Sequence, residues 1–530
     1  MGPSPDYQRL ASALSISPFR SHSAQRWRTA VLLVLAIMMI TLLLPTSHHS
    51  VSSGASRFVF SSPGQPIRDS QPTVAVADME WVTALMAAAS ASCGWGATPH
   101  RETTKSAYGP LQPMPEEYPY WLTNSDQFAL DDILTTRFQT YSKRVAVFSH
   151  SAPDFIYLPV LSQIWSNPWG CEHAKLHYGI QRTTRFLRDM VAKVGPSPYP
   201  RIILPIAPVR SQLERAVLTP EIMDEIRDSV ILVSIENAPK THQERMKYLI
   251  DVPYPTAFHL SLSSNGSRPT LDDSFLKANR PYLLHYAACA SHPWGMPATE
   301  TFNGFALRAA LHNQLTKYLS SLPPDRPSRI IYDNIGNPVD GAQNLTLFHE
   351  HMASAVFCPM PPGDSPSRRA FYEAILLGCI PVIFRRTAYG RLFPSAPEIN
   401  NLSQYTVFVD ENEMITRRGE PLVERLEAIP PATVQKLQRH IRQIAHKLQW
   451  AIPDQEEWFA QSSSASGRDP PPEDAPIFNH TRAVEQEKRN PPTEDAFAML
   501  LNELAKIRDG GWVPGKAVDV RQDPSDSYRY

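Results

Sequence analysis

The chain has 530 residues, and its 51 Lys and Arg residues are balanced by 52 Asp and Glu residues, which leaves a formal net charge of −1. This balance argues against nucleic acid as a partner, because nucleic-acid-binding domains carry an excess of basic residues. With 51 prolines but only 22 glycines, the chain is neither collagen-like nor a flexible Gly/Ser polymer, and 42% hydrophobic residues suffice for a folded core.

One apolar segment near the N-terminus has the character of a membrane helix. Residues 27–44 contain the run AVLLVLAIMMITLLL, slightly short of the roughly 20 residues that span a bilayer but sufficient for a thin internal membrane. Arginines precede this run and no Lys or Arg follows it before Arg57, so the positive-inside rule predicts a cytoplasmic tail over residues 1–26 and a lumenal remainder. We therefore expect a signal anchor with single-pass type II topology; the alternative is a cleaved signal peptide with a weak site at 53–55.

A lumenal location allows disulfides to form and makes Asn-x-Ser/Thr triplets usable as glycosylation acceptors. All five cysteines follow the apolar segment, and their odd number leaves at least one thiol without a partner in the same chain. The four triplets begin at Asn265, Asn344, Asn401 and Asn479.

The lumenal part divides into a stem, two α/β regions and a C-terminal end. Residues 45–114 are rich in Ser, Pro and Ala, with one helix-compatible stretch at about 74–91, and they predict a stem. Strand and helix patterns alternate over residues 115–278 and again over residues 279–460, which predicts a parallel sheet in each region. Ligands of such sheets bind outside the carboxyl ends of the strands, so we expect a cleft between the two halves. The chain then continues with a Pro-rich loop over 461–493, a helix over 494–508 and a tail over 509–530.

Short apolar runs mark the expected strands. They are residues 144–148, 154–158, 201–204 and 230–233 in the first region, and 282–285, 328–332, 354–358, 380–384 and 405–409 in the second. An amphipathic helix over about 431–450 closes the second region.

The most informative segment is 357–384, which reads as strand, loop, helix and strand. Ser365 is a favourable N-cap with Pro366 at the first helical position, and Gly378 ends the helix. The free N–H groups of a helix start at this edge of a sheet favour an anion.

Arg368 and Arg369 fall in the first turn of this helix, where cations oppose the helix dipole unless an anion such as a diphosphate neutralises them. Arg369 and Glu373 are i, i+4 neighbours, so the helix can present the guanidinium to phosphates and the carboxylate to ribose hydroxyls. The alternative is an ordinary surface salt bridge.

Cys358 and Cys379 lie at the end of one expected strand and the start of the next. Strand ends and strand starts lie at opposite edges of a parallel sheet, so a bond between them requires the chain to fold back at Gly378. Two buried free thiols are the alternative.

Residues 357–384 resemble the signature of exostosin-type glycosyltransferases (family 47). The order Pro-Pro-Gly-Asp-Ser, Arg-Arg and Gly-Cys-Ile-Pro-Val is most similar to the branch that contains plant xyloglucan galactosyltransferases. Further similar stretches follow the family's order, so the resemblance covers about residues 115–508; they are residues 128–134, 152–159, 252–259, 280–287, 403–408 and 495–497.

The resemblance implies a GT-B fold, in which two Rossmann-like domains face a cleft and the second holds a nucleotide-diphosphate sugar. It implies transfer of a hexose or pentose, with galactose suggested by the branch, to a polysaccharide or glycoprotein glycan in the Golgi. The resemblance also implies inversion at the anomeric carbon without a bound metal or cofactor. Homo-oligomers, or hetero-oligomers with other transferases, are a further expectation. The alternative is a noncatalytic family member that binds glycans or partners a transferase. The implied donor-binding residues are Gly363, Asp364, Ser365, Ser367, Arg368, Arg369 and Glu373, and the implied disulfide joins Cys358 to Cys379.

The catalytic base is the weakest part of the resemblance. Where the family usually carries a Gly-Arg-Asp-His run, this chain reads RIILPIAPVR over residues 201–210, without the acidic residue and the histidine. An inverting transferase needs a base to take the proton from the acceptor hydroxyl. Asp154, His150 and His173 are the candidates, although each could be an ordinary structural or surface residue.

Metal-site motifs offer little support for a rival chemistry. The run 410–413 (Asp-Glu-Asn-Glu) is the nearest approach to an Asp-x-Asp site and is expected to be a solvated loop. The run 349–351 (His-Glu-His) lacks the spacing of a helical zinc site and is expected on a helix surface.

Overall fold

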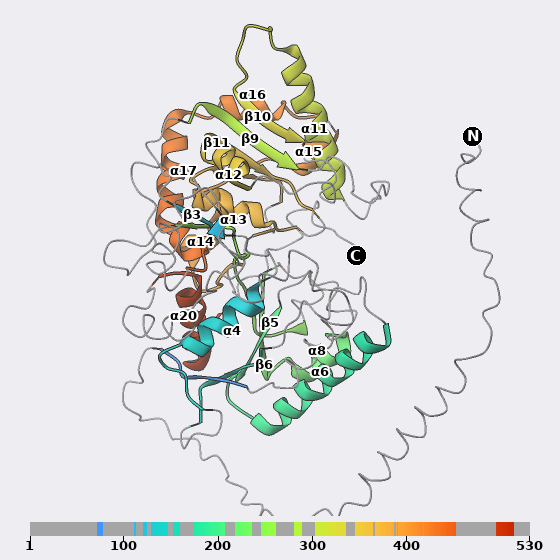
Figure 1. Ribbon diagram of the computed structural model, residues 1–530, viewed down its shortest axis with the longest axis vertical. Helices are drawn as coiled ribbons and strands as arrows, with labels where there is room; N and C mark the ends of the chain where they lie inside the picture. The colour runs from blue at the N-terminus through green and yellow to red at the C-terminus, as the bar shows by residue number, and fades with distance from the viewer. Residues whose placement is uncertain are drawn as a thin grey trace, which may run out of the picture. The chain divides into compact units, whose positions relative to one another are not determined.

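The computed structural model shows an α/β protein with two parallel sheets and one small antiparallel sheet (Figure 1). Residues Asp69–Tyr530 form one compact unit, to which every element below belongs. Within the residues that the structure describes, no helix combines the length and apolar character that a bilayer crossing requires, and residues 27–44 lie outside them. The described residues are 71–77, 111–112, 120–123, 129–146, 152–159, 173–206, 218–235, 245–260, 280–288, 303–334, 345–363, 366–385, 388–389, 391–416, 418–451 and 494–513.

The first parallel sheet has the strand order β1-β4-β5-β6-β7. Every residue of β5 and β6 is buried, as expected for parallel strands that are covered on both faces. Three of the five strands match expected ones. The strands are β1 (Val74–Val76), β4 (Phe155–Tyr157), β5 (Ile202–Ile206), β6 (Val230–Ser234) and β7 (Leu249–Asp251).

The edge strand β1 corrects the sequence analysis in two ways. Val74–Val76 was expected in the stem and in a helix-compatible stretch, yet it pairs in parallel with Phe155–Tyr157. The expected strand at 144–148 is reduced, in its described part, to a single bridge between Arg144 and Val74. A run of three small or β-branched apolar residues suits a buried strand, and Val74 and Ala75 are fully buried.

Helices α4 (Leu130–Thr140), α6 (His173–Val194) and α8 (Pro220–Ile226) accompany the first sheet. Figure 1 shows α6 as a long helix beside the short α8. The start of α8 follows sequence rules, since the side chain of Thr219 accepts a hydrogen bond from the Ile222 N–H and proline occupies the first turn.

The second parallel sheet has the order β10-β9-β11-β12-β13. All five expected strands of this region are present, although β9 runs three residues and β10 and β11 two residues beyond their expected ends. The strands are β9 (Tyr282–Ala288), β10 (Ile330–Asn334), β11 (Ala355–Met360), β12 (Ile380–Ile383) and β13 (Val407–Phe408).

The connections of the second sheet are mostly helical. Helix α12 packs on β9 and β11, and α13 packs on β11 and β12. The amphipathic pattern expected at 431–450 becomes α17 followed by the 3₁₀ turn η5. The helices are α11 (Asn303–Ser321), α12 (Leu345–Ala353), α13 (Arg369–Leu376), α14 (Pro397–Asn400), η4 (Leu402–Gln404), α15 (Glu411–Thr416), α16 (Leu422–Glu427), α17 (Pro431–Ile444) and η5 (Ala445–Leu448).

A small antiparallel sheet contains β2 (Leu111–Gln112), β3 (Tyr120–Thr123) and β8 (Phe258–Leu260). Its strand β2 also falls in the expected stem. Strand β8 contacts α13, which brings this sheet close to the segment that carries the family signature.

The last helix, α20 (Ala496–Arg508), returns to the first half of the fold, and the helix expected at 494–508 is confirmed. Asp495 caps it by accepting a hydrogen bond from the Ala498 N–H. The same carboxylate lies 3.2 Å from the Arg137 guanidinium of α4, and both side chains are almost fully buried. A buried ion pair and the Phe138–Phe497 ring contact therefore join the end of the fold to α4.

Candidate functional site

The loop between β11 and α13 lies at the carboxyl edge of the second sheet, where ligands of parallel sheets bind. The expected helix start at Ser365 and Pro366 is wrong, because α13 begins at Arg369. Arg368 precedes it with an extended backbone, φ −144° and ψ 143°, so the helix cannot continue back through it. Asp364 and Ser365 lie outside the described residues, whereas Ser367 is buried in the loop.

The expected end of α13 at Gly378 is confirmed. Gly378 has φ +69°, a conformation that glycine adopts without steric cost. The N–H of Gly378 donates to the Ile375 carbonyl and the N–H of Cys379 to the Ala374 carbonyl. These two bonds are those of a Schellman cap.

Cys358 and Cys379 are joined by a disulfide in the structure, with their Cα atoms 6.0 Å apart. The two residues do not lie at opposite sheet edges, because β11 continues past Cys358 to Met360. Cys358 pairs with Pro381, two residues beyond Cys379, so the bond crosses neighbouring strands close to the start of β12.

Helix α11 lies directly against the backbone of the loop between β11 and α13. The Arg308 Nε donates to the Pro362 carbonyl at 3.0 Å. A Cβ atom on Gly304 would lie 2.8 Å from that same carbonyl oxygen, and one on Gly363 would lie 2.6 Å from Arg308 Nη2. Glycine at 304 therefore allows the helix and the loop backbone to touch.

Two arginines in the segments that follow β11 and β12 have no carboxylate partner in the part of the chain that the structure describes. The Arg368 Nη1 donates to the Pro361 carbonyl at 3.2 Å. Arg391 is only 7% exposed, and its Nε and Nη1 atoms have no hydrogen-bond partner among the described residues. Arg368 lies near Tyr389: burial raises the pKa of Tyr389, and the charge of Arg368 opposes that rise.

Arg369 and Glu373 form an ion pair, with Arg369 Nε 2.8 Å from Glu373 Oε1. The pair is not the ordinary surface salt bridge, because the two side chains are 19% and 5% exposed. The same carboxylate oxygen accepts a hydrogen bond from the Ala257 N–H at 3.2 Å and lies 3.6 Å from His349 Nε2. Glu373 therefore joins α13 to α12 and to the residue before β8.

The electrostatics of Glu373 follow from these partners. Burial by itself would raise the pKa of its carboxyl group, but the positive charge of Arg369, the nearby His349 and the hydrogen bond from the Ala257 N–H lower the pKa to about 2. Nearby His259 in β8 is 1% exposed, and its burial, together with the charge of Arg369, lowers its pKa to about 3. Glu373 is thus ionised and His259 neutral at physiological pH.

The three candidate bases are not brought together in the described part of the chain. The Asp154 carboxylate accepts hydrogen bonds from the backbone and side chain of Thr73 at 2.9 and 3.0 Å, and it lies 3.5 Å from Arg508. These contacts use the carboxylate to hold β1, β4 and α20 together. His150 lies outside the described residues, and His173 is the first residue of α6, with its side chain outside them.

Two other runs of the sequence have surroundings that differ from the expected ones. The run 410–413 is not a solvated loop, because α15 begins at Glu411, which is 2% exposed and pairs with buried Arg385, two residues after β12. Asp410 starts α15 by accepting hydrogen bonds from the N–H groups of the second and third residues after it.

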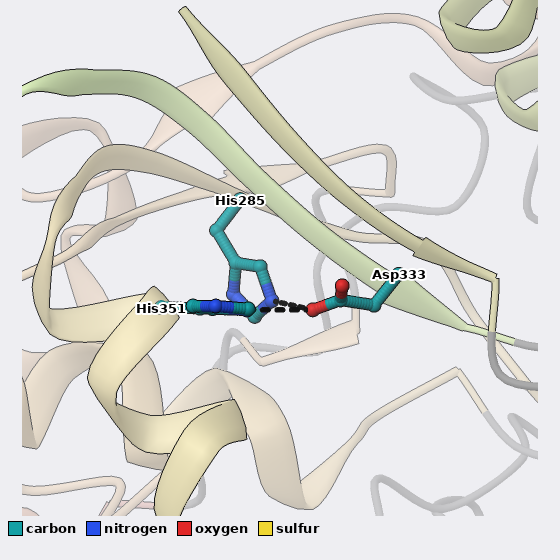
Figure 2. Close-up of side chains that lie close together, drawn as sticks. All are labelled: His285, Asp333 and His351. Atoms are coloured by element: carbon teal, nitrogen blue, oxygen red, sulfur yellow. Dashed lines mark hydrogen bonds and ion pairs between the residues drawn. The ribbon is translucent and has the colours of Figure 1, made fainter. Parts of the chain in front are cut away.

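The run 349–351 also departs from the expected helix surface. His349 is fully buried, and His351 meets two residues from the neighbouring strands, His285 of β9 and Asp333 of β10 (Figure 2). Burial lowers the pKa of His285, although its bond to Asp333 opposes the effect, and the hydrogen bond from His285 lowers the pKa of Asp333. No spacing rule links these three residues, which come from three separate elements.

Of the four expected glycosylation acceptors, only Asn401 is described. It is exposed, and its side-chain oxygen accepts a hydrogen bond from Ser403 Oγ at 2.8 Å. Asn265, Asn344 and Asn479 lie outside the described residues.

Comparison with known proteins relates these features to a family. Residues 114–420 match the Exostosin GT47 domain. A probable xyloglucan galactosyltransferase of Arabidopsis thaliana is 27% identical over 231 residues, which cover 43% of this chain and 42% of that protein. A xyloglucan galactosyltransferase of the same plant is 34% identical over 206 residues, covering 39% of this chain and 30% of that protein.

A further probable xyloglucan galactosyltransferase of Arabidopsis thaliana is 40% identical over 217 residues, covering 37% of this chain and 31% of that protein. The chain thus spans less than half the length of the curated relatives that it matches. Among solved structures, a putative UDP-N-acetylglucosamine 2-epimerase from Listeria monocytogenes aligns with a TM-score of 0.27 and 9% identity, covering 65% of this chain and 95% of that one, which is too weak to support an argument. The domain match includes both parallel sheets from β4 to β13 and the loop before α13, and by this match the chain belongs to the exostosin GT47 family of glycosyltransferases.

Proposed function

We propose that this chain transfers a sugar from a nucleotide-diphosphate donor to the glycan of a polysaccharide or glycoprotein, with inversion at the anomeric carbon and without a metal in the transfer step. Membership of a glycosyltransferase family and the names of the relatives support this proposal. Those names also favour galactose as the sugar and a xyloglucan-like polysaccharide as the acceptor.

One observation carries the proposal: Arg368, in the loop after β11, and Arg391, in the segment after β12, have no carboxylate partner in the described part of the chain. A charge that is buried and unpaired is strongly unfavourable, so the guanidinium of Arg391 is best accounted for by an anionic ligand. A diphosphate suits this position because arginine binds phosphate oxygens through several N–H groups at once.

The chemistry of transfer explains why such groups are useful. When the glycosidic bond to the donor breaks, negative charge builds on the departing nucleotide diphosphate, and fixed guanidinium groups lower the barrier by stabilising that charge. Arg369 is held in place by Glu373, which is itself bonded to Ala257. In this proposal the carboxylate orients Arg369, in place of the ribose contact that the resemblance suggested.

The wider setting is part of the same proposal. The two parallel sheets would be the Rossmann-like halves of a GT-B enzyme, with the acceptor beside the first and the donor beside the second. Residues 27–44 would anchor the chain in the Golgi membrane with its catalytic part in the lumen. The base that deprotonates the acceptor would be His150 or His173, since the carboxylate of Asp154 is engaged by Thr73.

The experiment is nucleotide release by the purified full-length chain, incubated with a panel of UDP- and GDP-sugars and with xyloglucan as acceptor. We expect release with at least one donor, and a loss of at least tenfold in the Arg368→Ala and Arg391→Ala variants. Arg188→Ala is the matched control, because Arg188 forms an exposed ion pair with Glu225 on the first half of the fold. Absence of release and of any thermal shift with every nucleotide would reject the enzyme and favour a noncatalytic glycan-binding protein.

A further inference from the structure

Three side chains from different elements converge beside the second sheet. His285 lies on β9, Asp333 on β10 and His351 in the last turn of α12 (Figure 2). The register pairs Asp333 with the second residue after His285, so both side chains project from the same face of the sheet. Helix α12 packs on β9 and so brings His351 to that face.

The ligand atoms of this cluster have the separations that a metal ion needs. Asp333 Oδ2 lies 3.2 Å from His285 Nε2 and 2.9 Å from His351 Nδ1, and each of the three residues offers a ligand atom within 4.8 Å of those of the other two. In a tetrahedral zinc site with bonds of about 2.0–2.1 Å, ligand atoms are about 3.3 Å apart. Shifts of a few tenths of an ångström would therefore give the two nitrogen–oxygen pairs the separation that ligand atoms have around a zinc ion.

We propose that His285, Asp333 and His351 bind a divalent transition-metal ion of the zinc class. Two imidazoles and one carboxylate form a donor set that zinc and neighbouring metals prefer over magnesium or calcium, which favour oxygen ligands. The side chains of Asp333 and His351 are 39% and 26% exposed, whereas that of His285 is buried. Solvent can therefore supply a fourth ligand on the Asp333 and His351 side.

The consequence of this site is mechanical. The metal would join α12 to β9 and β10 through His351. The same helix carries His349, two residues before His351. The Nε2 atom of His349 lies 3.6 Å from the carboxylate of Glu373 in α13. Fixing α12 would therefore stabilise the ion pair that holds Arg369. This inference rests on the three ligand residues alone and does not depend on the proposed activity.

The test uses the full-length chain after treatment with EDTA. Zn²⁺ alone is titrated into the protein, and binding is monitored with a competing indicator dye. We expect one equivalent of Zn²⁺ to bind tightly and to raise the melting temperature of the protein. Co²⁺ in its place should produce visible absorption bands of a four- or five-coordinate nitrogen–oxygen site. The variants Asp333→Asn and His351→Gln should each weaken Zn²⁺ binding by at least tenfold and abolish the Co²⁺ bands. Both positions are partly exposed, so these variants are expected to fold.

The control is His440→Gln, since His440 is another partly buried histidine of the same half, bonded to the Glu398 carbonyl. It should retain the tight equivalent and the Co²⁺ bands. Absence of a tight equivalent in the wild-type chain would overturn the proposal and leave a metal-free pair of hydrogen bonds to Asp333. Binding that survives in both ligand variants would also overturn it, because the metal would then sit on other histidines.

Discussion

The substitution Glu373→Gln tests whether the charge of this carboxylate stabilises the packing of α13 against α12 and the segment before β8. Glutamine keeps the shape and an acceptor for the Ala257 N–H but loses the charge that faces Arg369 and His349. The pKa of Glu373 falls from 4.5 to about 2 on folding, and a shift of this size corresponds to about 3 kcal/mol of folding free energy at pH 7. We therefore expect the free energy of unfolding to fall by about 3 kcal/mol at pH 7.

The pH dependence gives this prediction its sign. The folded-state pKa is lower than the unfolded one, so the contribution is complete above about pH 4.5 and is lost as the pH falls towards 2. The difference between wild type and variant should shrink to about 2 kcal/mol at pH 3.5. The difference in unfolding free energy is measured by urea unfolding at both pH values, monitored by tryptophan fluorescence. Glu225→Gln is the control, because Glu225 belongs to an exposed ion pair. A loss no larger than that of the control, or a difference unchanged between pH 7 and 3.5, would refute the reasoning.

Three further substitutions test other parts of the fold. Gly304→Ala puts a Cβ 2.8 Å from the Pro362 carbonyl, so we expect a loss of about 1–3 kcal/mol in urea unfolding and weaker nucleotide binding by calorimetry; unchanged values would contradict the close contact. Replacing Cys358 and Cys379 together by Ser opens a link spanning 21 residues, and calorimetric melting should show a loss of about 3 kcal/mol, whereas wild-type stability would argue against the bond. Asp495→Ala removes the cap of α20 and the buried partner of an arginine; we expect a loss of about 3–5 kcal/mol and faster proteolysis at α20, and wild-type resistance would count against this account.

The sequence predicted the second sheet better than the first, because its strands are continuous apolar runs bounded by clear turn signals. Gly378 illustrates a reliable signal, since a helix end that needs φ > 0 leaves little choice of residue. The start of α13 was misjudged because Ser365 and Pro366 are local cap signals, whereas the extended backbone of Arg368 sets the start in the folded chain. Tertiary packing overrides such local signals where a loop lies against another helix. The loop before α13 does so, because Arg308 of α11 donates to the Pro362 carbonyl.

The candidate site was predictable only where one segment carried it. Arg368, Arg369 and Glu373 lie in one stretch and could be named from spacing. The environment of Glu373 could not, because Ala257 is 116 residues away in the chain. Arg391 likewise gives no sign in the sequence that its guanidinium is buried, and the cluster of Figure 2 gathers residues from two strands and a helix. Such contacts depend on topology, which no period or cap signal encodes.

The position of β1 at one edge of the first sheet bears on how the protein can be shortened. A chain that starts after residue 77 would lack this strand and would leave the backbone N–H and C=O groups along one side of β4 unpaired. Bare strand edges recruit other chains, so such a fragment should aggregate. Any shortened version should begin before Pro72, whose carbonyl accepts a hydrogen bond from the Tyr141 hydroxyl at 2.9 Å.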